Sequence, residues 1–286
     1  MAVIQVENLT HIYSVGTPFE KTAIEDISLT IGQGEFIGLL GHTGSGKSTF
    51  IQHLNALLSP TTGTVRLNGE YINKDKYTRR NVKWKVGLVF QYLEYQLFEE
   101  TVFADIAFGP KNMGLGKEEI EERVREAAAF TGISEELFER SPLELSGGQK
   151  RRIAIAGVIA MRPEVLILDE PTAGLDPAGS SQIMANIRTV REKSGATVVI
   201  VSHNMDDAAR YAGRLIVFDH GHVVMDGTPE EVFSRAAELR AIGLNVPKAT
   251  ELAEALRAQG IPLEGSVFTR EQLLAAVLKA GEVPAC

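Results

Sequence analysis

Short runs of apolar, often β-branched residues recur along the chain between longer stretches with helical spacing. Such runs occupy residues 35–40, 86–90, 165–169 and 197–202. Continuous apolar strands are typical of a parallel sheet that helices cover on both faces. Polar residues stand at their ends, and open α/β sheets bind ligands at the carboxyl edge of the strands. The pattern therefore predicts an α/β fold with a parallel sheet and a ligand site at that edge.

A second group of strands is predicted to form a smaller antiparallel layer beside this core. These strands cover residues 5–9, 24–31 and 64–67. Glycine-containing turns at residues 32–34 and 68–69 follow two of them, as expected where a chain reverses direction.

The helical patterns divide the rest of the chain. Residues 117–130 carry charged and apolar positions at helical spacing, and two compact helical patterns follow residue 243, at 250–258 and 269–280. Thr269 and Gln272 match a capping box at the start of the last one. We predict one domain over 1–243 with a helical subdomain at about 92–160, and a small C-terminal helical domain over 244–286.

Composition excludes several classes of protein. The net charge of −8 and the isoelectric point of about 5.4 disfavour a nucleic-acid partner, since the basic clusters are short. The only cysteine, Cys286, excludes an intramolecular disulfide and fits a reducing compartment. The apolar runs are far shorter than the roughly 20 residues of a membrane-spanning helix, and no signal-peptide pattern is visible. Any role at a membrane would therefore require a partner.

Residues 41–48 match the phosphate-loop pattern of glycine, four residues, glycine, lysine and serine, and stand between a predicted strand and a helix. Backbone N–H groups of such a loop surround a phosphate, Lys47 can neutralise phosphate charge, and Ser48 offers a hydroxyl to Mg²⁺. We interpret His42 and Thr43 as loop residues without catalytic work. The predicted ATP-binding residues here are Gly41, His42, Thr43, Gly44, Ser45, Gly46, Lys47, Ser48 and Thr49.

Two carboxylates, Asp169 and Glu170, stand at the end of the apolar run 165–169. In isolation such acids are more often solvated residues or helix caps, but the phosphate loop upstream favours a functional reading. Asp169 is the candidate Mg²⁺ ligand, and Glu170 is the candidate that polarises the water attacking the γ-phosphate.

Residues 145–149, Leu-Ser-Gly-Gly-Gln, resemble the signature motif of ATP-binding cassette (ABC) proteins, and further motifs of that family match in order. The resemblance implies an ABC nucleotide-binding domain in which the signature of one subunit closes over the γ-phosphate held by a second ABC ATPase, identical or similar. The signature residues that would do so are Ser146, Gly147, Gly148 and Gln149.

The same resemblance assigns roles to four further residues. Gln91 is similar to the glutamine that senses Mg²⁺ and the attacking water. Residues 173–176, which follow the acids, resemble the D-loop of the family, and its Asp176 is a candidate nucleotide contact. His203 resembles the switch histidine that donates to a γ-phosphate oxygen. Tyr13 resembles the aromatic residue that stacks on adenine. The alternatives are a structural histidine at position 203 and ordinary packing of Tyr13 in the β-layer.

Residues 90–98 and 107–112, with 13–20 and 151–157, are similar to the ATPases of energy-coupling factor (ECF) transporters. Those ATPases energise uptake of vitamins or of cobalt and nickel ions. They work in pairs beneath an integral membrane coupling subunit (T component) and a substrate-binding membrane subunit (S component). The resemblance implies a peripheral location on the cytoplasmic face of the cell membrane. One departure is Leu93, where proline is more usual.

The apolar cluster after Gln91 is a candidate coupling surface. It contains two tyrosines, two leucines and a phenylalanine, and a partner's basic amphipathic helix could bind there. The alternative is that these side chains anchor the helical subdomain to the sheet. Two rival functions remain open: a soluble ABC-type regulator acting on ribosomes or DNA, and an ATPase from another ABC branch. The cluster residues are Tyr92, Leu93, Tyr95, Leu97 and Phe98, interrupted by Glu94.

Overall fold

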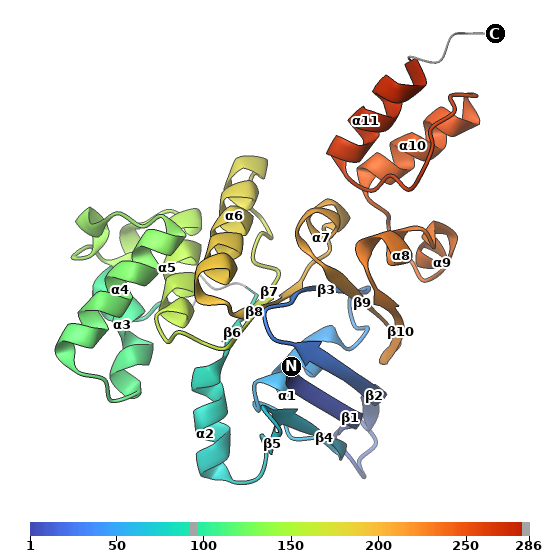
Figure 1. Cartoon of the computed structure of the whole chain (residues 1–286). Helices are drawn as coiled ribbons and strands as arrows, with labels where there is room; N and C mark the ends of the chain where they lie inside the picture. Colours follow the sequence, from blue (N-terminus) through green and yellow to red (C-terminus); the bar gives the residue numbers. More distant parts are fainter. Residues whose placement is uncertain (92–95, 282–286) are drawn as a thin grey trace.

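A six-stranded sheet forms the centre of the protein, whose computed structural model describes residues 1–91 and 96–281 (Figure 1). The strand order is β10-β9-β3-β8-β7-β6, with all neighbours parallel except β10 and β9. The predicted parallel sheet is confirmed, and the two strands at one edge, β9 and β10, are additions that the sequence analysis did not place. The strands are β3 (Phe36–Leu40), β6 (Val86–Val89), β7 (Val165–Asp169), β8 (Thr197–Val201), β9 (Arg214–Asp219) and β10 (His222–Gly227).

The central strands are buried because their side chains alternate between two apolar clusters. On β7, Leu166 and Leu168 belong to the cluster shared with the helices, whereas Val165 and Ile167 belong to the cluster shared with the second sheet. A strand covered on both faces needs apolar residues at every position, which explains the continuous runs in the sequence.

The second sheet is the predicted antiparallel layer, with the order β2-β1-β4-β5. Its long strands extend beyond the predicted ranges. Helix α1 (Lys47–Leu54) packs in the cluster between the two sheets. Asn55 caps its C-terminal end and donates to the Val86 carbonyl. The remaining elements are β1 (Ala2–Tyr13), β2 (Lys21–Gly32), β4 (Thr62–Leu67), β5 (Glu70–Tyr71) and α2 (Lys76–Lys85).

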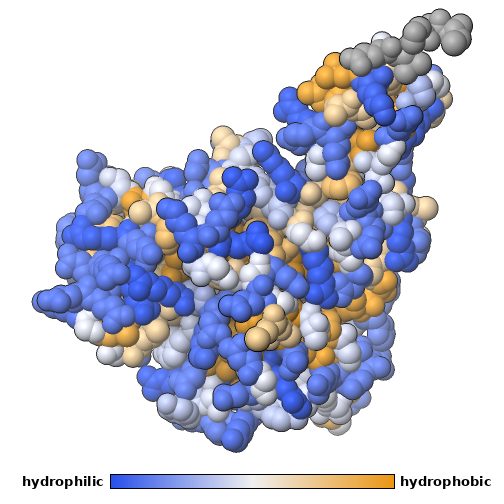
Figure 2. Space-filling view, viewed as in Figure 1, coloured by the Kyte–Doolittle hydropathy of each residue, from blue (hydrophilic) through white to orange (hydrophobic). Residues whose placement is uncertain are grey.

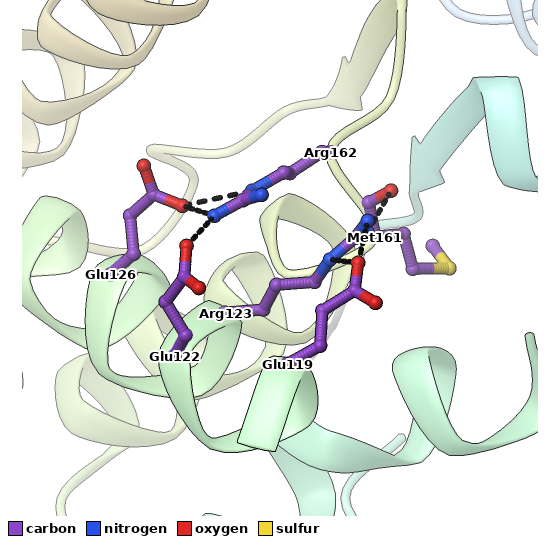
Figure 3. Close-up of polar contacts among 6 residues, drawn as sticks. All are labelled: Glu119, Glu122, Arg123, Glu126, Met161 and Arg162. Atoms are coloured by element: carbon purple, nitrogen blue, oxygen red, sulfur yellow. Dashed lines mark hydrogen bonds and ion pairs between the residues drawn. The ribbon is translucent and has the colours of Figure 1, made fainter. Parts of the chain in front are cut away.

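The helical region lies to one side of the large sheet, coloured green in Figure 1. It contains α3 (Val102–Asn112), α4 (Lys117–Thr131), α5 (Gly147–Ile159) and the short helices η2 (Glu135–Leu137) and η3 (Pro142–Glu144). Two arginines fasten α4 to the segment between α5 and β7 (Figure 3). Arg162 donates to Glu122 and Glu126, each at 2.7 Å, and Arg123 donates to the Met161 carbonyl at 3.2 Å.

Helices α6 (Pro177–Ser194) and α7 (Met205–Tyr211) lie over the large sheet, and α8 (Pro229–Phe233) and α9 (Ala236–Ala241) follow β10 (Figure 1). Among the described residues, no helix combines the length and the apolar character that crossing a bilayer requires.

The last two helices, α10 (Lys248–Ala258) and α11 (Arg270–Gly281), project from the rest of the chain (Figure 1). They share a small apolar cluster of their own, built on Ala253 and Leu263. The predicted capping box is confirmed, because Gln272 N donates to Thr269 Oγ1 at 3.2 Å and Thr269 N donates to Gln272 Oε1 at 3.0 Å. Figure 2 shows apolar surface on this pair, which exposes Leu252, Leu274, Val277 and Leu278. The domain boundary at 243 stays a prediction.

Candidate nucleotide-binding and active site

The phosphate loop joins β3 to α1 and requires glycine for steric reasons. Gly46 has a φ of 106°, and a Cβ there would lie 2.7 Å from Ile24 Cγ2 and 2.8 Å from the Ala23 carbonyl oxygen. The loop is also held from outside, since Gly221 N donates to the Ser45 carbonyl at 3.0 Å. The loop conformation therefore depends on β2 and on the turn after β9 as well as on its own sequence.

The ammonium group of Lys47 lies inside the loop. It donates to the carbonyls of Gly41 at 2.6 Å and His42 at 2.9 Å. Burial lowers the pKa of Lys47, and the negative charges of Asp169 and Glu170 oppose that shift. A buried cation among carbonyl groups is suited to bind phosphate oxygens, which offer it a full counter-charge.

Ser48 and Asp169 meet at the carboxyl edge of the large sheet. Ser48 Oγ donates to Asp169 Oδ2 at 3.4 Å. Burial raises the pKa of Asp169, and the charge of Glu170 raises it further, while Lys47 opposes both effects. A hydroxyl and a carboxylate are the oxygen donors that Mg²⁺ prefers, and a cation beside Asp169 would offset the cost of its buried charge.

The Glu170 carboxylate connects the loops that follow three neighbouring strands, β6, β7 and β8. Gln91 Nε2 donates to Glu170 Oε2 at 3.0 Å, and His203 Nε2 lies 2.9 Å from Oε1. Glu170 has a φ of 50°, a left-handed conformation that is costly for a residue with a side chain. Its N–H donates to the Val201 carbonyl at 3.0 Å, which helps to hold this conformation.

Tyr13 lines the same pocket, beside Thr49. Its hydroxyl is 3.2 Å from Thr49 Oγ1, and the side chain remains 40% exposed. The pocket, of about 290 Å³, brings together most of the predicted residues and adds Lys21 and Ala23 of β2, which carry no sequence motif. Its lining residues include Tyr13, Thr43, Gly44, Gly46, Lys47, Ser48, Thr49, Gln91, Asp169, Glu170 and His203.

The signature residues lie elsewhere on the described chain and are absent from the lining of this pocket. Ser146 caps α5 in a capping box: Gln149 N donates to Ser146 Oγ at 3.3 Å, and Ser146 N donates to Gln149 Oε1 at 3.0 Å. Asp176, also outside the pocket, caps α6 by accepting from Gly179 N at 2.8 Å. One chain thus presents its predicted nucleotide contacts on two separate surfaces.

A buried arginine links these surfaces. Arg151, in the first turns of α5, donates to the carbonyls of Pro171 and Ala173, in the segment directly after Glu170. The sequence analysis did not predict this role for Arg151, because the recognisable signature motif consists of the residues just before it, 145–149. The contact joins α5 directly to the segment that follows Glu170.

A phosphate loop and paired acids at one sheet edge, together with a separate glycine-rich helix start, define the class of this protein as an ABC ATPase. The sequence profile described as "ABC transporter" matches residues 24–173, and the chain belongs to this family.

The relatives and solved structures agree on this family. The chain is 53% identical over 276 residues to "Energy-coupling factor transporter ATP-binding protein EcfA2" of Caldanaerobacter subterraneus subsp. tengcongensis, covering 96% of each chain. The protein of the same name from Clostridium perfringens is 52% identical, with 96% and 97% covered.

Among solved structures, CbiO1 from Clostridium perfringens, described as part of the ABC transporter complex CbiONQ, aligns with a TM-score of 0.76 and 39% identity, covering 88% of this chain and 99% of that one. A dimeric ATP-binding cassette in a post-hydrolysis state, bound to ADP and Pi, aligns with a TM-score of 0.72 and 29% identity, covering 79% and 98%. The predicted fold class, the ECF membership and the ATPase activity are confirmed: the chain is an ATP-hydrolysing subunit of an ECF-type ABC transporter.

Proposed function

We propose that this chain forms half of a composite ATPase that powers uptake of a micronutrient, a vitamin or a transition-metal ion, by an ECF transporter. The observation that carries the proposal is the separation of the phosphate-loop pocket from the signature residues. The other half is a second ABC ATPase, either a copy of this chain or a similar one. The likeness to a dimeric cassette supports this arrangement.

The signature glycines support a partner's approach. A Cβ at Gly147 would meet nothing within 4 Å, and one at Gly148 would meet only Leu175 Cδ2 at 3.9 Å. Packing within the chain therefore does not demand glycine at either position. The first N–H groups of a helix have no intrahelical acceptor and attract anions. We infer that the glycines keep these N–H groups open to the γ-phosphate bound by the partner ATPase.

The pocket residues divide the work of hydrolysis. Lys47 and the loop N–H groups hold the phosphates, and Tyr13 stacks on adenine. Ser48 and Asp169, with Gln91 nearby, would hold Mg²⁺, which would neutralise phosphate charge when bound. Glu170 accepts a proton from the attacking water, and His203, which lies beside that carboxylate, donates to the γ-phosphate.

A groove of about 320 Å³ beside the helical subdomain is the proposed binding site for the T component. Phe98 and Phe108 meet edge to face in its wall at 4.8 Å between ring centres, and both are exposed. Asp105 lies buried there, its Oδ2 atom has no hydrogen-bond partner among residues 1–91 and 96–281, and burial raises its pKa. An amphipathic helix with a basic residue would cover the aromatic rings and pair with this carboxylate.

The described part of the predicted coupling cluster, Leu97 and Phe98, lines this groove. Tyr92, Leu93, Glu94 and Tyr95 lie outside the described residues. Binding to an integral T component would place the chain peripherally on the cytoplasmic face of the cell membrane, and the solute would be chosen by the S component.

Purification of the tagged chain from its native membranes tests the assembly. We expect an integral T component and an S component to co-purify, and we expect Lys47→Ala to leave the complex intact while it abolishes ATP-driven uptake in vesicles. Isolation with ribosomes and without membrane subunits would contradict the proposal.

The composite site has a separate test. Ser146→Arg, which adds bulk at the signature, is expected to retain ATP binding and to lose hydrolysis. Ser134→Arg changes another helix-capping serine and serves as the control. Normal hydrolysis by Ser146→Arg would exclude a role of the signature in the active site.

A further inference from the structure

Three side chains converge on the side of the phosphate loop that the ATPase roles above leave unused. His42 belongs to the loop, Asp219 is the last residue of β9, and His220 follows it in the turn before β10. His42 Nε2 lies 3.0 Å from Asp219 Oδ1, and His220 Nε2 lies 3.8 Å from the same oxygen. We propose that these three residues bind a divalent transition-metal ion, such as Zn²⁺ or Co²⁺, which fastens the phosphate loop to this turn.

Both ring nitrogens of His42 face hydrogen-bond acceptors, so a neutral imidazole alone cannot satisfy both contacts. Its Nδ1 lies 2.9 Å from the Thr43 carbonyl oxygen, while its Nε2 faces the Asp219 carboxylate. A neutral imidazole has a single N–H, so it can donate to only one of these two acceptors. The other contact needs either an additional proton or a metal ion. Donation from Nδ1–H to a carbonyl with a metal on Nε2 is the usual arrangement of a metal-bound histidine.

The spacing of the three ligand atoms suits a tetrahedral ion. Bonds of about 2.0–2.1 Å place the ligand atoms of a tetrahedral zinc site roughly 3.3 Å apart. The two observed separations lie on either side of this value, and all three atoms lie within 4.8 Å of one another. Small rotations of the exposed His220 side chain would equalise them, and water would complete the coordination.

The donor set distinguishes this site from the proposed Mg²⁺ site. Two imidazole nitrogens and one carboxylate suit Zn²⁺, Co²⁺ or Ni²⁺, whereas Mg²⁺ prefers oxygen ligands such as Ser48 and Asp169. The side chains of His42 and Asp219 are only 32% and 18% exposed, so their contact is partly shielded from solvent. The His220 side chain is 82% exposed, so an ion can reach the site from that side.

The backbone holds the two segments together without an ion. His220 adopts a left-handed φ of 45°, and the following Gly221 N donates to the Ser45 carbonyl at 3.0 Å. Gly221 O in turn accepts from Glu25 N at 3.0 Å. Little backbone conformational entropy is therefore lost when the ion binds. The ion would add a direct bridge between residue 42 and the turn.

Co²⁺ titration of nucleotide-free protein in excess Mg²⁺ tests the proposal, with the visible absorption bands of tetrahedral Co²⁺ as the readout. We expect one such ion per chain and a rise in the thermal unfolding temperature. Asparagine tolerates the left-handed backbone at position 220, so His220→Asn should leave the turn intact and weaken Co²⁺ binding by about tenfold or more. The matched control is His222→Asn, because His222 lies in the adjoining strand and contacts Glu25 instead.

Two results would overturn the proposal. One is the absence of tetrahedral Co²⁺ binding in the wild-type protein, which would leave an additional proton to satisfy the second contact of His42. The other is equal Co²⁺ affinity of the wild type and His220→Asn, with the bound ion lost instead in Asp169→Asn; the ion would then occupy the Mg²⁺ site.

Discussion

Replacing Glu170 by glutamine separates ATP binding from ATP hydrolysis. Glutamine has nearly the same shape and must adopt the same left-handed backbone, so the substitution adds little new strain. The carboxylate accepts from Gln91 Nε2 and faces His203 Nε2 with its two oxygens, at 3.0 and 2.9 Å. An amide has one oxygen and one NH₂ group, so it preserves at most one acceptor role and cannot take the proton of water.

The magnitude follows from the lost proton transfer. A positioned general base contributes about 10²–10⁴ in rate, and each tenfold is about 1.4 kcal/mol of activation free energy. We therefore expect Glu170→Gln to raise the barrier by about 3–5 kcal/mol. Lys47, Ser48 and the loop backbone are unchanged, and one negative charge near the phosphates is removed. ATP affinity should consequently stay equal or increase.

The assay pairs phosphate release at saturating ATP with equilibrium binding of labelled ATP, in the purified transporter complex. Glu164→Gln is the matched control: Glu164 is an acid just before β7, at the far end of the strand, and pairs with the exposed Lys85 at 3.1 Å. Its turnover should equal that of the wild type. Hydrolysis by Glu170→Gln within tenfold of the wild type would refute the assignment of Glu170 as the base.

Three further predictions concern stability, measured by thermal or urea unfolding of the nucleotide-free chain. The pKa of Asp169 is raised, so the folded state binds the carboxyl proton more tightly than the unfolded state, and the stability of the wild type falls as pH rises from the unfolded-state pKa through the folded-state pKa. Asp169→Asn carries no such charge and should be the more stable protein at neutral pH. Equal stability of the two proteins at neutral pH would contradict this. Gly46→Ala should lower the free energy of unfolding by at least about 1–3 kcal/mol, because Gly46 has a positive φ and a Cβ there would make close contacts. Gly213→Ala is the control and should lower it less, because a Cβ there meets only one atom, at 3.9 Å. Arg162→Gln should cost less than about 1 kcal/mol, because its ion pairs are exposed; a larger loss would show that they act as a unit.

Much of the fold was predictable because local pattern and global structure agree. The four predicted apolar runs are the strands β3, β6, β7 and β8, each buried on both faces. Strand β9 carries the same kind of run at residues 215–218 and is equally buried, but the sequence analysis did not place it. Strand β10 was missed because it lies at the sheet edge and is mostly exposed, with only Met225 fully buried. Helix α2 was missed because a single residue, Val82, is buried in it, so it shows no apolar stripe.

The site residues that belong to motifs were predictable, whereas residues that support them through tertiary contacts were not. Glycine at position 46 follows from the loop pattern, but the atoms that demand it belong to Ile24 and Ala23 of β2. The contact between His42 and Asp219 joins residues 177 positions apart. Such a pairing depends on β9 lying beside β3, which no local spacing in the sequence specifies.

The electrostatics of the pocket favour the binding of a phosphate group together with a cation. Burial lowers the pKa of Lys47 and raises that of Asp169, so the fold disfavours the charged form of both groups. Phosphate oxygens and a cation would each provide the missing counter-charge, and part of the binding free energy relieves this cost. Arg151 connects the segment after Glu170 to the signature helix, so a rearrangement around the nucleotide would reach α5 through this contact. Because α5 also lines the proposed T-component groove through Ile153 and Val158, the same helix joins the nucleotide pocket to the surface where the membrane partner would bind.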